Sequence, residues 1–137
     1  MKKKTYPLSY AGQKQTFAKC VVVGDLVFCS GMSGRLVETG EVRNDDPYAQ
    51  TVDALDKIKN VLEEAGSSLE NIVKMTVYFK DIIRDGEKIW FGAMMDYFRK
   101  HAPSLAEDMP AATAVGVNSL YFPRMLVEID VIAVIPR

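Results

Sequence analysis

The stretch DPYAQTVDALDKIKNVLEEAGSSLENIVKMTVYFKD, residues 46–81, decides the fold because it predicts a helix, a turn and a strand in succession. Asp46 can accept a hydrogen bond from a free N–H at the start of the helix, and Pro47 suits the first helical position because it lacks an N–H. Gly66 can end the helix in the left-handed conformation. Between these ends, apolar residues recur at intervals of three and four and predict one apolar face: Ala49, Val52, Leu55, Ile58, Val61, Leu62 and Ala65.

Polar residues such as Asp53, Lys57 and Glu64 fall largely outside this apolar face. After the helix, residues 67–70 predict one short turn that redirects the chain. The period then changes to two, which is the period of a strand. One side of this strand is predicted to be apolar: Val73, Met75, Val77 and Phe79. The whole stretch therefore predicts a helix packed on a sheet.

The composition is that of an ordinary globular protein, with 48% hydrophobic and 26% charged residues among 137. We expect a single domain over residues 1–137 that buries about two thirds of the surface of the unfolded chain. The formal net charge of −1 gives no long-range attraction for nucleic acid or anionic lipid. No run reaches transmembrane length, and the N-terminal lysines precede no apolar signal segment. We therefore expect no nucleic-acid or membrane partner and a cytoplasmic location.

The segments on either side of the central stretch predict further strands and bends. Residues 1–14 predict a loose arm or a short edge strand, and residues 16–23 and 26–30 predict a hairpin. Gly31 and Gly34 follow without the Gly-Lys-Ser/Thr ending of a phosphate loop. We expect them to form bends where the backbone passes close to a sheet edge or a ligand.

The second half of the chain predicts one more helix and two more strands. A turn is expected around Asp81 and Asp85-Gly86, and an amphipathic helix from Ile89 to His101. Residues 104–109 are expected to form a loop, and the last two strands are expected at 111–117 and 125–135. This order predicts a two-layer α+β domain with both helices on one face of the sheet. Small and apolar residues occupy both sides of the 111–117 strand, so we expect another subunit to cover the second face.

Several side chains that can carry chemistry have a structural interpretation that we favour. Cys20 and Cys29 lack the spacing of a metal site and are expected to be buried free thiols, with a redox pair or catalytic thiol as the alternative. The Met and aromatic residues of the second helix are expected to form core rather than a ligand box. His101 ends that helix, where a cationic ring suits the helix dipole, and catalysis by His101 is the alternative.

Glu128 is the most informative single residue, because it stands inside the apolar run Leu126–Ile132. A carboxylate in such a run loses hydration, which raises its pKa and suits it to proton transfer or to holding a water. Asp130 lies on the same side of the strand, and paired carboxylates can divide acid and base roles. An edge position or a structural ion pair for Glu128 is equally consistent with the sequence.

Four segments together resemble the Rid family, also called the YjgF family or the reactive-intermediate deaminases. They are VGDLVFCSG at 23–31, Gln50-Thr51, LEEAGSSLENIVKMTVY at 62–78 and LVEIDVIA at 126–133. The resemblance implies a chorismate-mutase-like α+β subunit with a mixed sheet, assembled as a homotrimer with ligand clefts between subunits. It also implies hydrolysis of enamines and imines to ketoacids and ammonium without a metal or cofactor.

The resemblance also assigns site residues, and some of them differ from the family pattern. Glu128 matches the family glutamate that places the attacking water, and Ser30 and Gly31 match the Ser-Gly motif that helps to form the substrate site. The family arginine that grips the substrate carboxylate is replaced by Ala112, and the family tyrosine is replaced by Phe17.

Two more positions bear on the missing contacts. The family asparagine falls at Met94 or Met95. Arg124 could supply a replacement cation from the loop before the last strand, or could equally lie on the trimer surface. These differences leave two leading interpretations, a divergent imine deaminase and a noncatalytic binding or regulatory trimer. RNA cleavage is least favoured, because the chain has no basic stripe.

Overall fold

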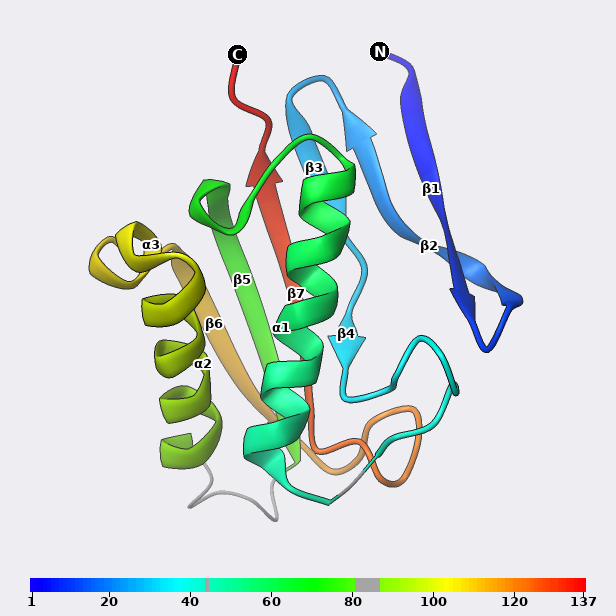
Figure 1. Ribbon diagram of the computed structural model, residues 1–137, viewed down its shortest axis with the longest axis vertical. Coiled ribbons are helices and arrows are strands. Elements are labelled where there is room, and N and C mark those ends of the chain that lie inside the picture. The colour runs from blue at the N-terminus through cyan, green and yellow to red at the C-terminus, as the bar shows by residue number, and fades with distance from the viewer. Residues whose placement is uncertain (44, 81–86) are drawn as a thin grey trace.

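The computed structural model of the protein describes residues 1–43, 45–80 and 87–137. These residues form one mixed sheet with helices against one of its faces (Figure 1). The strands are β1 (Lys3–Tyr10), β2 (Gln13–Val23), β3 (Leu26–Cys29), β4 (Met32–Ser33), β5 (Ile72–Lys80), β6 (Ala111–Val117) and β7 (Val127–Val134). Their order across the sheet is β1-β2-β3-β7-β5-β6, with β4 also paired to β7. The helices are α1 (Pro47–Glu64), α2 (Glu87–His101) and the short α3 (Pro103–Glu107), and a 3₁₀ turn spans Leu69–Asn71.

The ends of α1 are those that the sequence predicts. Asp46 Oδ1 accepts a hydrogen bond from Tyr48 N at 2.9 Å, Pro47 is the first helical residue, and Gly66 adopts a φ of 88° after the helix. The centre of the predicted apolar face is fully buried: Leu55, Ile58 and Leu62. Figure 1 shows α1 and α2 side by side on one face of the sheet. The prediction of a two-layer α+β fold with both helices on one face is confirmed.

Lys57 lies in a different environment from the one its position in the helical pattern suggests. Its side chain is only 8% exposed, and its Nζ donates to Tyr10 Oη at 3.1 Å and to the Arg35 carbonyl at 2.7 Å. Tyr10 ends β1 and Arg35 follows β4, so two segments distant in sequence cover this side of α1. The periodicity of one helix cannot reveal such a cover.

The predicted apolar side of β5 is right at its centre and wrong at its start. Met75 and Val77 are buried, but Val73 is 45% exposed and Ile72 takes its place in the core. The pairing of β5 with β7 shifts register between Ile72 and Lys74. This irregularity reverses the direction of the first side chains, and the alternating pattern alone does not predict it.

Two other expectations are decided by the structure, and a third lies outside the described residues. Of the two alternatives for residues 1–14, a loose arm and a short edge strand, the edge strand is right, because β1 stands at the edge of the sheet and pairs with β2 from Lys3 opposite Val23 to Tyr10 opposite Gln13. The expected loop at 104–109 is largely the helix α3. The expected turn at Asp81 and Asp85-Gly86 falls outside the described residues. The hairpin and the last two strands are confirmed as β2–β3, β6 and β7.

The sheet face opposite α1 and α2, here called the open face, carries the acidic residues of β7. Val127, Ile129 and Val131 point into the core, whereas the intervening Glu128 and Asp130 are half-buried and point the other way. Beyond β5 lies the edge strand β6, in which every residue except Val117 is exposed. None of the helices in the described part of the chain is long and apolar enough to cross a membrane.

Candidate functional site

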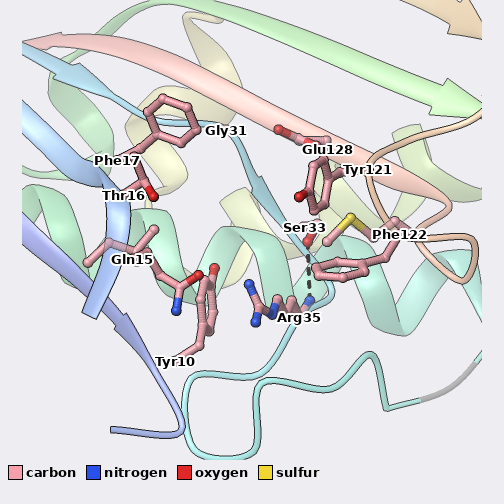
Figure 2. A pocket seen from close by; sticks show the side chains of 12 residues that line it. Tyr10, Gln15, Thr16, Phe17, Gly31, Ser33, Arg35, Tyr121, Phe122 and Glu128 are labelled. Atoms are coloured by element: carbon pink, nitrogen blue, oxygen red, sulfur yellow. Dashed lines mark hydrogen bonds between the residues drawn. The ribbon is translucent and has the colours of Figure 1, made fainter. Parts of the chain in front are cut away.

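A cavity of about 260 Å³, here called the Glu128 cavity, opens between the β1–β2 hairpin, β4 and the start of β7 (Figure 2). Its polar and aromatic lining includes Tyr10, Phe17, Ser33, Arg35, Tyr121, Phe122 and Glu128. In Figure 2, Phe17, Gly31 and Glu128 lie along the upper wall, and Tyr10 and Arg35 lie below them. The cavity therefore has a carboxylate and a guanidinium in different parts of one lining.

Gly31 makes room for the Glu128 carboxylate. On one side of β7 the pairing passes from Phe28 opposite Ile132 to Met32 opposite Ile129, so the β3–β4 segment contains one extra residue. This extra residue bends the chain beside Glu128. A Cβ built on Gly31 would lie 2.0 Å from Glu128 Oε1, so a larger residue would displace the carboxylate. The expected close approach of the backbone at Gly31 is confirmed, and its partner is Glu128.

A second glycine and a buried amide fix the chain that leads into β7. Gln50 is 1% exposed, its Nε2 donates to the Arg124 carbonyl at 2.9 Å, and its Oε1 accepts from Leu126 N at 2.8 Å. A Cβ on Gly34 would lie 2.6 Å from Gln50 Cγ, so this glycine lets the chain after β4 pass over the amide. Gln50 thereby fixes Leu126, which immediately precedes β7 and lies two residues before Glu128.

The pKa of Glu128 is raised above its usual range, chiefly because burial disfavours the carboxylate. The Lys57 ammonium opposes this shift, and the neighbouring Asp130 adds to it. A carboxyl group with a raised pKa can take up and release a proton closer to neutral pH than an exposed one. The predicted behaviour of a carboxylate in an apolar run is therefore found at Glu128.

Lys57 and Tyr10 form a buried polar pair next to this cavity. Burial lowers the pKa of Lys57 to about 8, although Glu128 favours its charged form. Burial raises the pKa of Tyr10, so its hydroxyl stays protonated at neutral pH. Tyr10 Oη accepts from Lys57 and can donate its own proton into the cavity.

Arg35 is held by two aromatic rings and by hydrogen bonds. The guanidinium carbon lies 4.0 Å from the centre of the Tyr10 ring and 4.9 Å from the centre of the Phe122 ring. Nε donates to the Gly40 carbonyl at 2.7 Å, and the backbone N–H of Arg35 donates to Ser33 Oγ at 3.3 Å. The cation–π contacts and the hydrogen bonds together give this cation a defined orientation.

The residues predicted for the site fall into two groups. Phe17, Gly31 and Glu128 line the Glu128 cavity. Ser30 lies beside it without lining it, and its Oγ donates to the Ala18 carbonyl at 2.6 Å. Ala112 is exposed on the edge strand β6, opposite Met75 of β5, and lies away from this cavity in the single subunit.

Arg124 also lies outside the lining of the Glu128 cavity. Its Nε is 3.2 Å from Asp45 Oδ1, and 53% of its side chain is exposed. It lines a neighbouring cavity that also touches Arg35 and Phe122. The structure thus brings Arg35, rather than Arg124, into the space that contains Glu128.

Sequence reasoning missed three residues that line the cavity, Tyr10, Ser33 and Arg35, and also Lys57, which lies next to it and bonds to Tyr10. Tyr10 falls in a segment expected to be a loose arm or a short edge strand, and Lys57 falls among the polar residues of a helix. Arg35 follows two glycines in the segment Gly-Met-Ser-Gly-Arg, and this spacing carries no motif. These residues come together only in the folded chain, where Tyr10 at the end of β1 contacts Lys57 of α1 and the Arg35 guanidinium.

The other candidate residues occupy structural positions. Cys20 and Cys29 are buried free thiols directly opposite each other in β2 and β3, and burial raises their pKa values to about 11 and about 12. The ring of His101 packs against the ring of Tyr97, with 4.2 Å between the ring centres, and lies away from the cavity. Met94, at one of the two positions aligned with the family asparagine, is core. In the described ranges, no group of three or more His, Cys, Asp or Glu residues is arranged to hold a metal ion.

The fold and the cavity define a small α+β protein with a carboxylate in a pocket, and comparisons with known proteins identify its family. Residues 11–135 match the family described as Endoribonuclease L-PSP. A RutC family protein of Pyrococcus abyssi is 36% identical over 118 residues, which cover 85% of this chain and 84% of the relative. The chain belongs to this family, which is the YjgF/Rid family that its sequence resembles.

Solved structures of relatives agree with the fold. The YjgF gene product of Escherichia coli superposes with a TM-score of 0.81 at 29% identity, covering 96% of this chain and 98% of the relative. Escherichia coli TdcF, in a structure with bound serine, gives a TM-score of 0.78 at 26% identity and covers 95% and 93%. The chorismate-mutase-like α+β fold that the resemblance implies is confirmed.

The raised pKa of Glu128 predicts how its replacement changes stability with pH. Below the pKa of Glu128 in the unfolded chain, about 4.3, both states are protonated and the group has no effect. Above the folded-state pKa, the ionised group destabilises the fold. Glu128→Gln should therefore raise the free energy of unfolding at pH 7, by no more than about 1 kcal/mol because solvent screens the group, and the gain should shrink toward pH 4. Urea unfolding at both pH values measures the effect.

The exposed Glu107 on α3 provides a matched control. Glu107→Gln should leave the difference between the two pH values unchanged. A Glu128→Gln variant that is less stable than wild type at pH 7 would show that the carboxylate is stabilised, rather than strained, in its cavity.

Proposed function

We propose that this chain is a subunit of a homotrimer with small-molecule clefts between subunits, and that it hydrolyses an enamine or imine to a carbonyl compound and ammonium. The observation that carries this proposal is the Glu128 carboxyl group, which has a raised pKa and lines a cavity beside a glycine. Membership of the YjgF/Rid family supports the reaction class. The serine bound to the TdcF relative supports a ligand of amino-acid size.

In the proposed reaction, Glu128 positions a water molecule beside the imine carbon. The water oxygen bonds to that carbon while Glu128 takes a proton from the water and passes it to the nitrogen, which gives a carbinolamine. Glu128 then takes the proton of the new hydroxyl group and passes it to the nitrogen, so that the C–N bond breaks as the C=O bond forms. Water and imine thus become a carbonyl compound and ammonia, which takes a proton from solvent. Phe17 supplies an apolar wall, and the backbone at Gly31 holds the polar end of the ligand. The Ser30 hydroxyl, which donates to the Ala18 carbonyl, supports this backbone from beside the cavity.

The proposed trimer rests on the exposed apolar surface of the sheet. Phe28 on β3, Val73 on β5 and Val115 on β6 are between 36% and 45% exposed, and Phe17 is 77% exposed. Large apolar side chains on an open sheet face are commonly covered by another subunit. In this arrangement β6, with Ala112, completes a cleft that one subunit leaves open.

The proposed location is the cytoplasm. Two free cysteines are consistent with a protein that resides in a reducing compartment.

A noncatalytic ligand-binding or regulatory trimer is the second candidate, because Ala112 stands where the family has its substrate-gripping arginine. Loss of a charge-assisted hydrogen bond typically weakens binding by about tenfold or more. RNA cleavage is not favoured, because the net charge of −1 provides little attraction for a phosphate backbone.

Ammonium release from freshly generated aliphatic and aromatic imines tests the catalytic proposal. Wild type should release ammonium, and Glu128→Gln should be slower by about a hundredfold or more, because a positioned acid–base group contributes that much. Ala112→Arg should add activity toward imines that bear a carboxylate. Equal rates for wild type and Glu128→Gln would sink the deaminase proposal. Ligand binding without turnover in wild type and Glu128→Gln would establish the noncatalytic alternative.

Sedimentation equilibrium tests the proposed assembly. Wild type should have three times the subunit mass of 15.3 kDa. Val115→Glu should shift the protein to smaller species, because a buried unpaired charge opposes association. The matched change Ile89→Glu, at a 44% exposed position on α2, should leave the trimer intact. A monomeric wild type, or a trimer broken by Ile89→Glu alone, would refute assembly through the sheet.

A further inference from the structure

The described ion pairs give Arg35 no carboxylate partner, although it lines the Glu128 cavity. The rings of Tyr10 and Phe122 lie within cation–π distance of its guanidinium, and the Gly40 carbonyl accepts a hydrogen bond from its Nε. These contacts orient the group without neutralising its charge. The N–H donors of Nη1 and Nη2 are the part of the fork left to meet a ligand.

The charges around the cavity are separated in a way that orients a polar ligand. Tyr10 lies within electrostatic reach of both Arg35 and Glu128, which shift its pKa in opposite directions. Lys57 Nζ, 3.1 Å from Tyr10 Oη, is also within electrostatic reach of both groups, since Glu128 favours its charged form and Arg35 disfavours it. Figure 2 shows Arg35 beside Tyr10 and apart from the Glu128 carboxyl group. An anionic group is therefore favoured at Arg35, and a group that exchanges protons is favoured at Glu128.

The geometry points to Arg35 as the residue that binds the carboxylate of the cavity's ligand, in place of the arginine missing at Ala112. This inference rests on the proposed small-molecule function of the cavity. A planar guanidinium binds a carboxylate through two parallel hydrogen bonds, and the described side-chain hydrogen bond of Arg35 uses Nε rather than Nη1 or Nη2. The ligand class is a small carboxylate whose imine or carbonyl carbon reaches the water held by Glu128.

Arg35 suits this role better than Arg124. Arg124 is paired with Asp45 at 3.2 Å and has a half-exposed side chain, so its charge is compensated and screened. Arg35 is partly buried between two rings, where solvent screens a charge less. The chain from Gly31 through Ser33 to Arg35 thus positions both ends of the ligand, since Gly31 makes room for Glu128 and Arg35 supplies the cation.

Calorimetric titration with 2-oxobutanoate and its uncharged analogue 2-oxobutanamide tests this inference without requiring turnover. Wild type should bind the carboxylate more tightly than the amide. Arg35→Gln should weaken carboxylate binding by about tenfold or more while changing amide binding by less than about twofold. Arg35→Lys should give an intermediate carboxylate affinity, because it keeps the charge and loses the planar fork.

Arg124→Gln and the surface change Arg99→Gln are the matched controls and should leave carboxylate binding unchanged. Retained carboxylate affinity in Arg35→Gln overturns the inference, as does loss of carboxylate and amide binding together, which would indicate a structural role. A loss confined to Arg124→Gln assigns the cation to Arg124 instead and also overturns it. Binding that depends on Arg35 without ammonium release leaves the inference standing while the proposed hydrolysis fails. If wild type hydrolyses neutral imines but binds no carboxylate, the proposed hydrolysis stands and the inference about Arg35 fails.

Discussion

The close approach of Gly31 to Glu128 is the constraint on which the site depends. The extra residue between β3 and β4 bends the chain toward β7, and only a residue without a Cβ leaves the carboxylate in place. Burial in that position raises the pKa of Glu128. The extra residue between β3 and β4 therefore influences the pKa of Glu128. The buried amide of Gln50 supports it by fixing the chain that enters β7.

The β1–β2 hairpin supplies the other half of the cavity. Tyr10 at the end of β1 contacts both Lys57 on α1 and Arg35 after β4, so one aromatic residue connects the helix layer with the cavity wall. Burial of Lys57 costs stability, because its ammonium is largely removed from water. The attraction between Lys57 and Glu128 offsets part of that cost and links the protonation of the two groups.

Periodicity was sufficient to predict α1, the centre of β5 and the placement of both helices on one face, because these depend on local burial. The isolated charge in an apolar strand was sufficient to single out Glu128. The register shift at Val73 and the burial of Lys57 were not predictable, because each depends on partners far away in the chain. Arg35 was missed for the same reason, since its role depends on rings contributed by β1 and by the loop before β7.

The titration of the Glu128 carboxyl carbon by NMR tests most directly whether the glycine bend holds this group in a desolvated position. The spectrum of Glu128→Gln assigns the signal, and Gly31→Ala removes the bend's defining feature. Wild type should titrate above the ordinary glutamate pKa of about 4.3, and Gly31→Ala should titrate closer to it. A wild-type pKa at or below the ordinary value, or the same raised value in Gly31→Ala, would contradict the account.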